Sequence, residues 1–126
     1  MDYFYKEKSD LSKEELIAQI EKQISISLCI QAAAQITEAV LLSRLYALKA
    51  DRDGESEIVA GVWIQSIGQT IEALAVSKEL STFNQDELRE LQKIIISSDF
   101  IQSIGAAIEG AGGIKVLTKT TESFIP

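Results

Sequence analysis

The sequence predicts an all-α protein, an antiparallel bundle of three long helices followed by a short C-terminal tail. The chain of 126 residues contains one Pro and seven Gly, too few turn-forming residues for a β-barrel or a β-sandwich. Long runs of helix-favouring residues are separated by only two short polar breaks, and short connections make consecutive helices antiparallel. We expect a single domain over residues 1–126, because its length and its 46% apolar content suit one ordinary core.

The first helix is expected over residues 13–48. Ser12 followed three residues later by Glu15 forms a capping box, which is typical of a helix start. Neither Gly nor Pro interrupts the chain between 13 and 48, which predicts a helix about 50 Å long at 1.5 Å per residue. The helix is either continuous or kinked around Ser25 and Ser27. Residues 49–54 are then expected to form a polar turn.

The second and third helices are expected over residues 55–80 and 85–110. Asn84 and Glu87 form a second capping box at the start of the third helix. The glycine-rich residues 110–113 are typical of a helix C-terminus, so the third helix should end there. The tail over residues 114–126 is expected to be either extended or loosely docked.

An internal repeat relates the second helix to the third. The sequence Ile-Gln-Ser-Ile-Gly occurs at residues 64–68 and again at 101–105, 37 positions later. Residues 58–75 and 95–112 agree at 8 of 18 positions. A looser copy falls in the first helix, at about residues 24–41. The second and third helices are therefore expected to present similar surfaces to their surroundings.

Two heptad patterns run through the repeats. Large apolar residues at alternating spacings of four and three predict a packed row on each helix. Beside them runs a row of small residues seven apart, and the first helix offers Ser27 and Ala34 in the same register. Glycine inside a helix costs about 1 kcal/mol relative to alanine, so a shared glycine position favours close helix packing. The residues of the packed row are Ala60, Ile64, Ile67, Ile71 and Leu74, with Ile101, Ile104, Ile108 and Ala111. The candidates for close packing are Gly61, Gly68 and Gly105, accompanied by Ala75, Ser98 and Gly112.

Residues 58–64 are apolar on every side of the predicted second helix. A surface helix of a monomeric bundle would show a polar stripe there. The segment must lie centrally or be covered by another subunit, and we expect a homo-oligomer, most simply a two-fold dimer. The candidate interface residues are Val59, Val62 and Trp63, with Phe100 as the repeat counterpart of Trp63.

The composition argues against most catalytic and cofactor sites. Histidine is absent, which removes the usual zinc ligand and the commonest general base near neutral pH. Cys29 lies in an apolar stretch, where a buried thiol is inert. A net charge of -7 with scattered basic residues lacks a nucleic-acid footprint. We therefore expect no enzyme activity, no catalytic residue, no cofactor and no nucleic-acid partner.

Glutamine and glutamate recur seven residues apart in all three repeat copies. Carboxylates aligned in a helical bundle can form a metal site, but such sites pair Glu with His. Because the chain has no histidine, a solvated helix face is the favoured interpretation and no metal site is expected. These residues are Gln31 with Glu38, Gln65 with Glu72, and Gln102 with Glu109.

The repeats resemble those of a family of uncharacterised repetitive helical proteins from Bacillus-type Gram-positive bacteria. The resemblance rests on the Trp-Ile-Gln-Ser-Ile-Gly and Phe-Ile-Gln-Ser-Ile-Gly segments at residues 63–68 and 100–105. The first helix departs from it, with Cys29 in place of the aromatic residue and Ala34 in place of the glycine. The resemblance implies a helical fold and no activity or ligand.

The sequence also bears on membranes and on location. The first residues lack the apolar core of a secretory signal. The longest uncharged runs, residues 23–37 and 58–71, are shorter than the 18 or so apolar residues of a typical membrane span. We expect a cytoplasmic, non-enzymatic protein that associates with itself, with a membrane partner disfavoured. The alternative is a membrane-active protein whose glycine-bearing helices, especially residues 100–114, insert into lipid.

Overall fold

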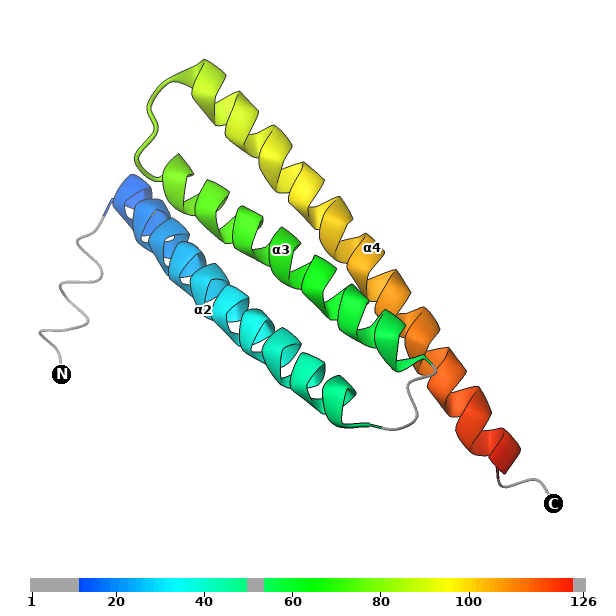
Figure 1. The fold of residues 1–126 in the computed structure, drawn as a ribbon. Helices are drawn as coiled ribbons and strands as arrows, with labels where there is room; N and C mark the ends of the chain where they lie inside the picture. The colour runs from blue at the N-terminus through cyan, green and yellow to red at the C-terminus, as the bar shows by residue number, and fades with distance from the viewer. Residues whose placement is uncertain (1–11, 50–53, 124–126) are drawn as a thin grey trace, which may run out of the picture.

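The protein folds as three antiparallel helices, and this confirms the predicted all-α bundle (Figure 1). The computed structural model describes residues 12–49 and 54–123. Its helices are α2 (Lys13–Leu48), α3 (Glu55–Glu79) and α4 (Gln85–Ser123), and no strand occurs in this part of the chain. Tyr3, Phe4 and Tyr5, which could have covered part of α3, lie outside the described residues.

Helix α3 occupies the centre of the arrangement. It packs against α2 on one side and against α4 on another, whereas within the described residues the backbones of α2 and α4 do not approach each other (Figure 1). The bundle is therefore an open layer folded around α3 rather than a closed three-helix cylinder. An open layer leaves more of each helix uncovered than a closed bundle does.

The predicted capping residues are found at both helix starts. The backbone N–H of Glu15 donates to Ser12 Oγ at 3.2 Å, and the backbone N–H of Asp86 donates to Asn84 Oδ1 at 2.8 Å. Each bond satisfies a donor that the first helical turn leaves free. From its cap, α2 runs as one unbroken helix of 36 residues.

The predicted end of the third helix at residue 110 is wrong, because α4 continues to Ser123. The extended or loosely docked tail predicted from residue 114 is wrong for the same reason over residues 114–123, and residues 124–126 lie outside the described part of the chain. Gly112 does not terminate the helix; it lets α4 lie close to the start of α3. A Cβ added at Gly112 would lie 2.5 Å from the carbonyl oxygen of Gly54. Beyond it, Lys115 Nζ forms an ion pair with Glu57 Oε1 at 2.5 Å, so the final turns of α4 have their own contact with α3.

Small residues bring the backbones of α3 and α4 together. A Cβ added at Gly61 would lie 2.5 Å from the backbone nitrogen of Glu109, and one added at Gly105 would lie 2.7 Å from the carbonyl oxygen of Gly61. A Cβ added at Gly68 would lie 2.9 Å from the carbonyl oxygen of Ser98. The structure thus places all three glycines where nothing larger fits. We call the complete set the small-residue row; all its members are buried, namely Gly54 at the start of α3, Gly61, Gly68 and Ala75 on α3, and Ser98, Gly105 and Gly112 on α4.

Helix α2 uses a different set of small residues from the one expected. Ser27 and Ala34 are exposed, so their assignment to the row was wrong. The reason is that α2 packs on another side of α3, away from the small-residue row, and that side determines its register. The buried residues there are Ser25, Ala32 and Ala39 of α2, with Val62, Ser66, Gln69 and Ala73 of α3.

The glycines of α4 give a paired stability test. A Cβ at Gly110 meets nothing within 4 Å, so Gly110→Ala should raise the free energy of unfolding by about 1 kcal/mol through helix propensity. Gly105→Ala should lower it by about 1–3 kcal/mol, because the new Cβ overpacks the α3 backbone. Urea denaturation measures both. Destabilisation by Gly110→Ala would contradict a helix that continues through residue 110.

Candidate interaction surface

The large apolar residues of the repeats do not form the packed row that the sequence predicted. Ile67 is 54% exposed, Leu74 is 67% exposed and Ile104 is 57% exposed. Because the backbones of α3 and α4 meet at the small-residue row, the neighbouring isoleucines are displaced to the outside of the contact. The predicted spacing is real, but the row is only partly covered: Ile64, Ile71, Ile101 and Ile108 are half-buried, and the other three are exposed.

The isoleucine rows of α3 and α4 lie on the same side of the helix pair. Glu57 is seven residues before Ile64, and Lys115 is seven residues after Ile108, so each shares a helix face with that isoleucine. The ion pair between Glu57 and Lys115 shows that the two faces adjoin. We name this surface the isoleucine face; it comprises Ile64, Ile67, Ile71 and Leu74 of α3 and Ile101, Ile104 and Ile108 of α4.

The same ion pair shapes the electrostatics of one end of the isoleucine face. The hydrogen bond from Lys115, followed by bonds from its own backbone and from Ser56, lowers the pKa of Glu57 to about 2. Glu57 therefore stays ionised over the whole physiological range. At the other end of the face, Lys78 lines one shallow surface depression together with Asp86, Glu87 and Glu90. The first end thus pairs one acidic with one basic side chain, whereas the second has three acidic side chains around one basic one.

The four predicted interface residues differ in how far they are exposed. Trp63 is 37% exposed, and its Nε1–H donates to Ser43 Oγ of α2 at 2.7 Å. Phe100 is 67% exposed, whereas Val59 is half-buried. Val62 is fully buried, so its assignment to a subunit interface was wrong; it faces α2, which fills that side of α3.

An apolar pocket adjoins the isoleucine face next to Trp63. It lies between α2 and α3 and offers almost no polar surface. An apolar pocket beside an exposed aromatic residue is a common feature of protein interfaces. Its lining residues are Ile36, Trp63, Ser66, Ile67, Thr70 and Ile71.

The glutamine and glutamate columns of α3 and α4 are not the solvated face that the sequence suggested. Gln65 Nε2 donates to Glu109 Oε2 at 3.1 Å, and Gln102 Nε2 donates to Glu72 Oε2 at 2.7 Å. All four side chains are half-buried. They join α3 to α4 on the side of the helix pair opposite the isoleucine face.

These two hydrogen bonds expose a pseudo-two-fold symmetry in the helix pair. The repeat offset of 37 converts Gln65 into Gln102 and Glu72 into Glu109, so it exchanges one bond for the other. It likewise exchanges the Gly61–Gly105 contact for the contact between Gly68 and Ser98. The sequence repeat is therefore expressed as an internal two-fold axis between α3 and α4.

Burial raises the pKa of Glu72 above its ordinary value. The hydrogen bond from Gln102 opposes this shift, and the nearby Asp99 carboxyl adds to it. On the side of α3 that contacts α2, Gln69 Nε2 is buried with no hydrogen-bond partner among the described residues. Helix α3 therefore buries polar groups at a cost toward both of its neighbours.

The thiol of Cys29 is exposed, not buried as the sequence suggested. Its Sγ lies 3.9 Å from Ser77 Oγ of α3, because this side of α2 borders α3 without being covered by it. Among the described residues, no group of three or more Cys, Asp or Glu side chains is arranged to hold a metal ion.

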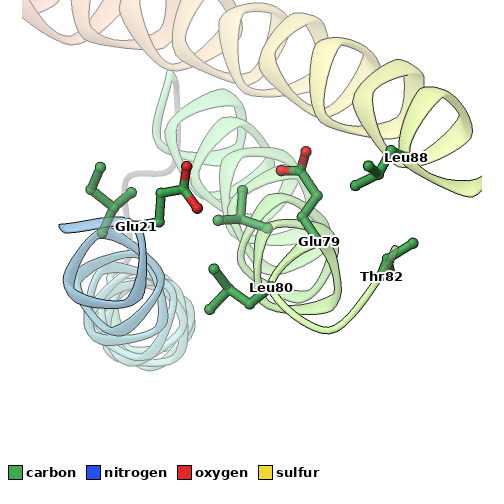
Figure 2. Close-up of a pocket in the computed structure, with 7 residues that line it drawn as sticks. Glu21, Glu79, Leu80, Thr82 and Leu88 are labelled. Atoms are coloured by element: carbon green, nitrogen blue, oxygen red, sulfur yellow. The ribbon is translucent and has the colours of Figure 1, made fainter. Parts of the chain in front are cut away.

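A cleft lies at the end of the bundle where the start of α2, the end of α3 and the start of α4 converge (Figure 2). Glu21 and Glu79 place two carboxylates at its rim, and Leu80 and Leu88 supply apolar walls. Thr82 supplies a hydroxyl. Its remaining lining residues are Ile24 and Val76.

Two of the helices are long and apolar enough to cross a membrane by length and composition, α2 and α3. The uncharged runs at residues 23–37 and 58–71 had indicated segments too short to cross a membrane. Of the most apolar stretch, 17% is buried in α2 and 39% in α3. The apolar surface of α2 is therefore the less covered of the two.

Comparison with protein-family models, with curated proteins and with solved structures finds no match to this chain.

The raised pKa of Glu72 predicts a pH-dependent effect of its replacement. A raised pKa means that the folded state holds the proton more tightly, so stability falls as pH rises through that pKa. Glu72→Gln keeps an acceptor for Gln102 and removes the buried charge. It should increase the free energy of unfolding at pH 7, and the gain should vanish below pH 4.5, the ordinary value for a glutamate.

Urea denaturation at the two pH values measures this effect. Glu90→Gln is the control, because Glu90 is exposed and pairs only with Lys93 on its own helix. A Glu72→Gln protein that is less stable than wild type at pH 7 would contradict the prediction, because the ionised carboxylate would then stabilise the folded state.

Proposed function

We propose that the protein is a non-enzymatic, cytoplasmic helical protein that associates with itself through the isoleucine face. The observation that carries this proposal is the exposure of the face: Ile67, Leu74 and Ile104 are each more than half exposed. Burying one such side chain is worth about 1.5–3 kcal/mol. A contiguous apolar surface of this kind is typical of an interaction site.

The internal symmetry of the face favours a second copy of this chain as the partner. Each isoleucine of α3 on the face has a counterpart on α4, as Ile64 has Ile101 and Ile67 has Ile104. A second copy placed about a two-fold axis meets two nearly equivalent helices and can pack against both at once. The expected product is a four-helix apolar layer made of two helix pairs.

Mass measurement by light scattering after size exclusion tests the proposal. Wild type should exceed the monomer mass of 13.8 kDa at tens of micromolar. Ile104→Glu should weaken a two-fold dimer by about 3 kcal/mol or more, since the side chain is buried twice. That corresponds to roughly a 100-fold rise in Kd.

Leu117→Glu is the matched control. Leu117 is 66% exposed on α4, and it points away from the isoleucine face. This variant should keep the wild-type mass, and circular dichroism should show that both variants remain helical. A wild-type monomer, or equal dissociation of both variants, would contradict the proposal.

A further inference from the structure

One twelve-residue pattern recurs in all three helices. A small residue is followed four positions later by glutamine, a second small residue stands seven positions after the first, and glutamate follows that residue by four positions. We call this pattern the Gln–Glu motif. It occupies residues 61–72 of α3, 98–109 of α4 and 27–38 of α2.

The Gln–Glu motifs of α3 and α4 bind each other. Their small residues lie together in the small-residue row, and each glutamine donates to the glutamate of the other helix. Gln65 Nε2 donates to Glu109 Oε2 at 3.1 Å, and Gln102 Nε2 donates to Glu72 Oε2 at 2.7 Å. The motif is therefore complementary to itself when two copies run antiparallel, because each supplies one amide donor and one carboxylate acceptor.

The Gln–Glu motif of α2 has no such partner in the monomer. Its defining residues, Ser27, Gln31, Ala34 and Glu38, are all exposed. Gln31 Nε2 donates only to Ser27 Oγ of its own helix, at 3.4 Å, and no hydrogen bond joins Glu38 to another helix within the described residues. At 3.6 residues per turn the four positions lie roughly 200–260° around α2 from Ala32, which is buried against α3. The motif therefore points away from α3.

We propose that two copies of this chain associate through their α2 helices, which pack antiparallel about a two-fold axis. Gln31 of each copy donates to Glu38 of the other, and Ser27 of each lies against Ala34 of the other. Since neither small residue is glycine, the two α2 axes lie farther apart than those of α3 and α4, and the long Gln and Glu side chains span the difference. The bonds between α2 and α3 stay in place.

Apolar side chains close both ends of this α2 contact. Ile20 is seven positions before Ser27, and Leu41 is seven positions after Ala34, so the same axis sets Ile20 of one copy against Leu41 of the other. They are 53% and 56% exposed in the monomer. Their burial adds a hydrophobic contribution to the two polar bonds.

Charge complementarity selects a second copy as the occupant of the α2 motif. The chain has a net charge of -7, yet in this contact each carboxylate meets an amide rather than another carboxylate. The motifs of α3 and α4 are already occupied, since Gly61, Gly68 and Gly105 are buried. Lipid hydrocarbon offers no hydrogen-bond partner to Gln31 or Glu38, whereas a second α2 supplies the matching donor and acceptor by symmetry.

The α2 contact is separate from the isoleucine face, which lies on α3 and α4, so one chain can form both. The wild-type mass at tens of micromolar should then exceed twice the 13.8 kDa of the monomer. Ile104→Glu disrupts the isoleucine face alone. This variant should remain a dimer held through α2, at twice the monomer mass.

Exchanging donor and acceptor in the Ile104→Glu background tests the pairing, with light scattering after size exclusion as the measurement. Gln31→Glu places a carboxylate opposite Glu38 at both bonds of the dimer and should raise Kd about 100-fold. Adding Glu38→Gln restores an amide opposite each carboxylate and should recover the dimer. Gln92→Glu makes the same charge change at an exposed position of α4 and should leave the dimer intact.

The outcomes separate the α2 contact from association through the isoleucine face. A monomeric Ile104→Glu protein overturns the α2 contact, whatever the mass of wild type. Failure of Glu38→Gln to restore the dimer overturns the Gln–Glu pairing, and so does equal dissociation by Gln31→Glu and Gln92→Glu. If wild type and Ile104→Glu are both dimers, the α2 contact stands and the isoleucine face is not used.

Discussion

The close approach of the α3 and α4 backbones is the constraint on which the rest of the structure depends. Glycine or another small residue occurs every seventh position on both helices, and a Cβ added at Gly61 or Gly105 would collide with backbone atoms of the facing helix. This contact sets the register of the pair. In that register Gln65 reaches Glu109 and Gln102 reaches Glu72, so the polar cross-links follow from the glycine spacing.

The same contact explains why so much apolar surface is exposed. When backbones touch, there is no room between the helices for isoleucine, and the large side chains of both repeats lie beside the contact, where they are half-buried or exposed. The buried hydrophobic side chains are correspondingly small: apart from Leu91 and Val62, they are alanines. The fold keeps its internal contacts short and leaves its large apolar residues available for contacts outside the monomer.

Much of the fold could be predicted from the sequence because its signals are local. Ser12 and Asn84 cap helices through bonds to residues two or three positions away, and the glycine spacing is visible without knowing what it packs against. The end of α4 could not be predicted, because the glycines at 110–113 have a local meaning, as a helix terminus, whereas Gly112 also has a tertiary one, as room for Gly54. Only the facing helix decides between them.

The candidate surface was harder to predict than the helices. A four-and-three spacing of isoleucines identifies one side of a helix but not whether that side is inside or outside. Val62 was wrongly predicted to lie at the surface, because the local sequence does not show that α2 packs beside it. The bonds joining Gln65 to Glu109 and Gln102 to Glu72 could have been predicted from the sequence. Gln and Glu recur seven residues apart on two antiparallel helices, and a two-fold axis between such helices brings each Gln to the Glu of the other helix.

The account rests on the small-residue row, and proton–proton distances across it test that row most directly. Nuclear Overhauser effects between the Hα protons of Gly61 and Gly105, and between those of Gly68 and Ser98, should be strong, since these backbones are in contact. Effects between the side chains of α2 and α4 should be absent within the described residues. If the effects between Gly61 and Gly105 and between Gly68 and Ser98 were missing, the central claim would be wrong.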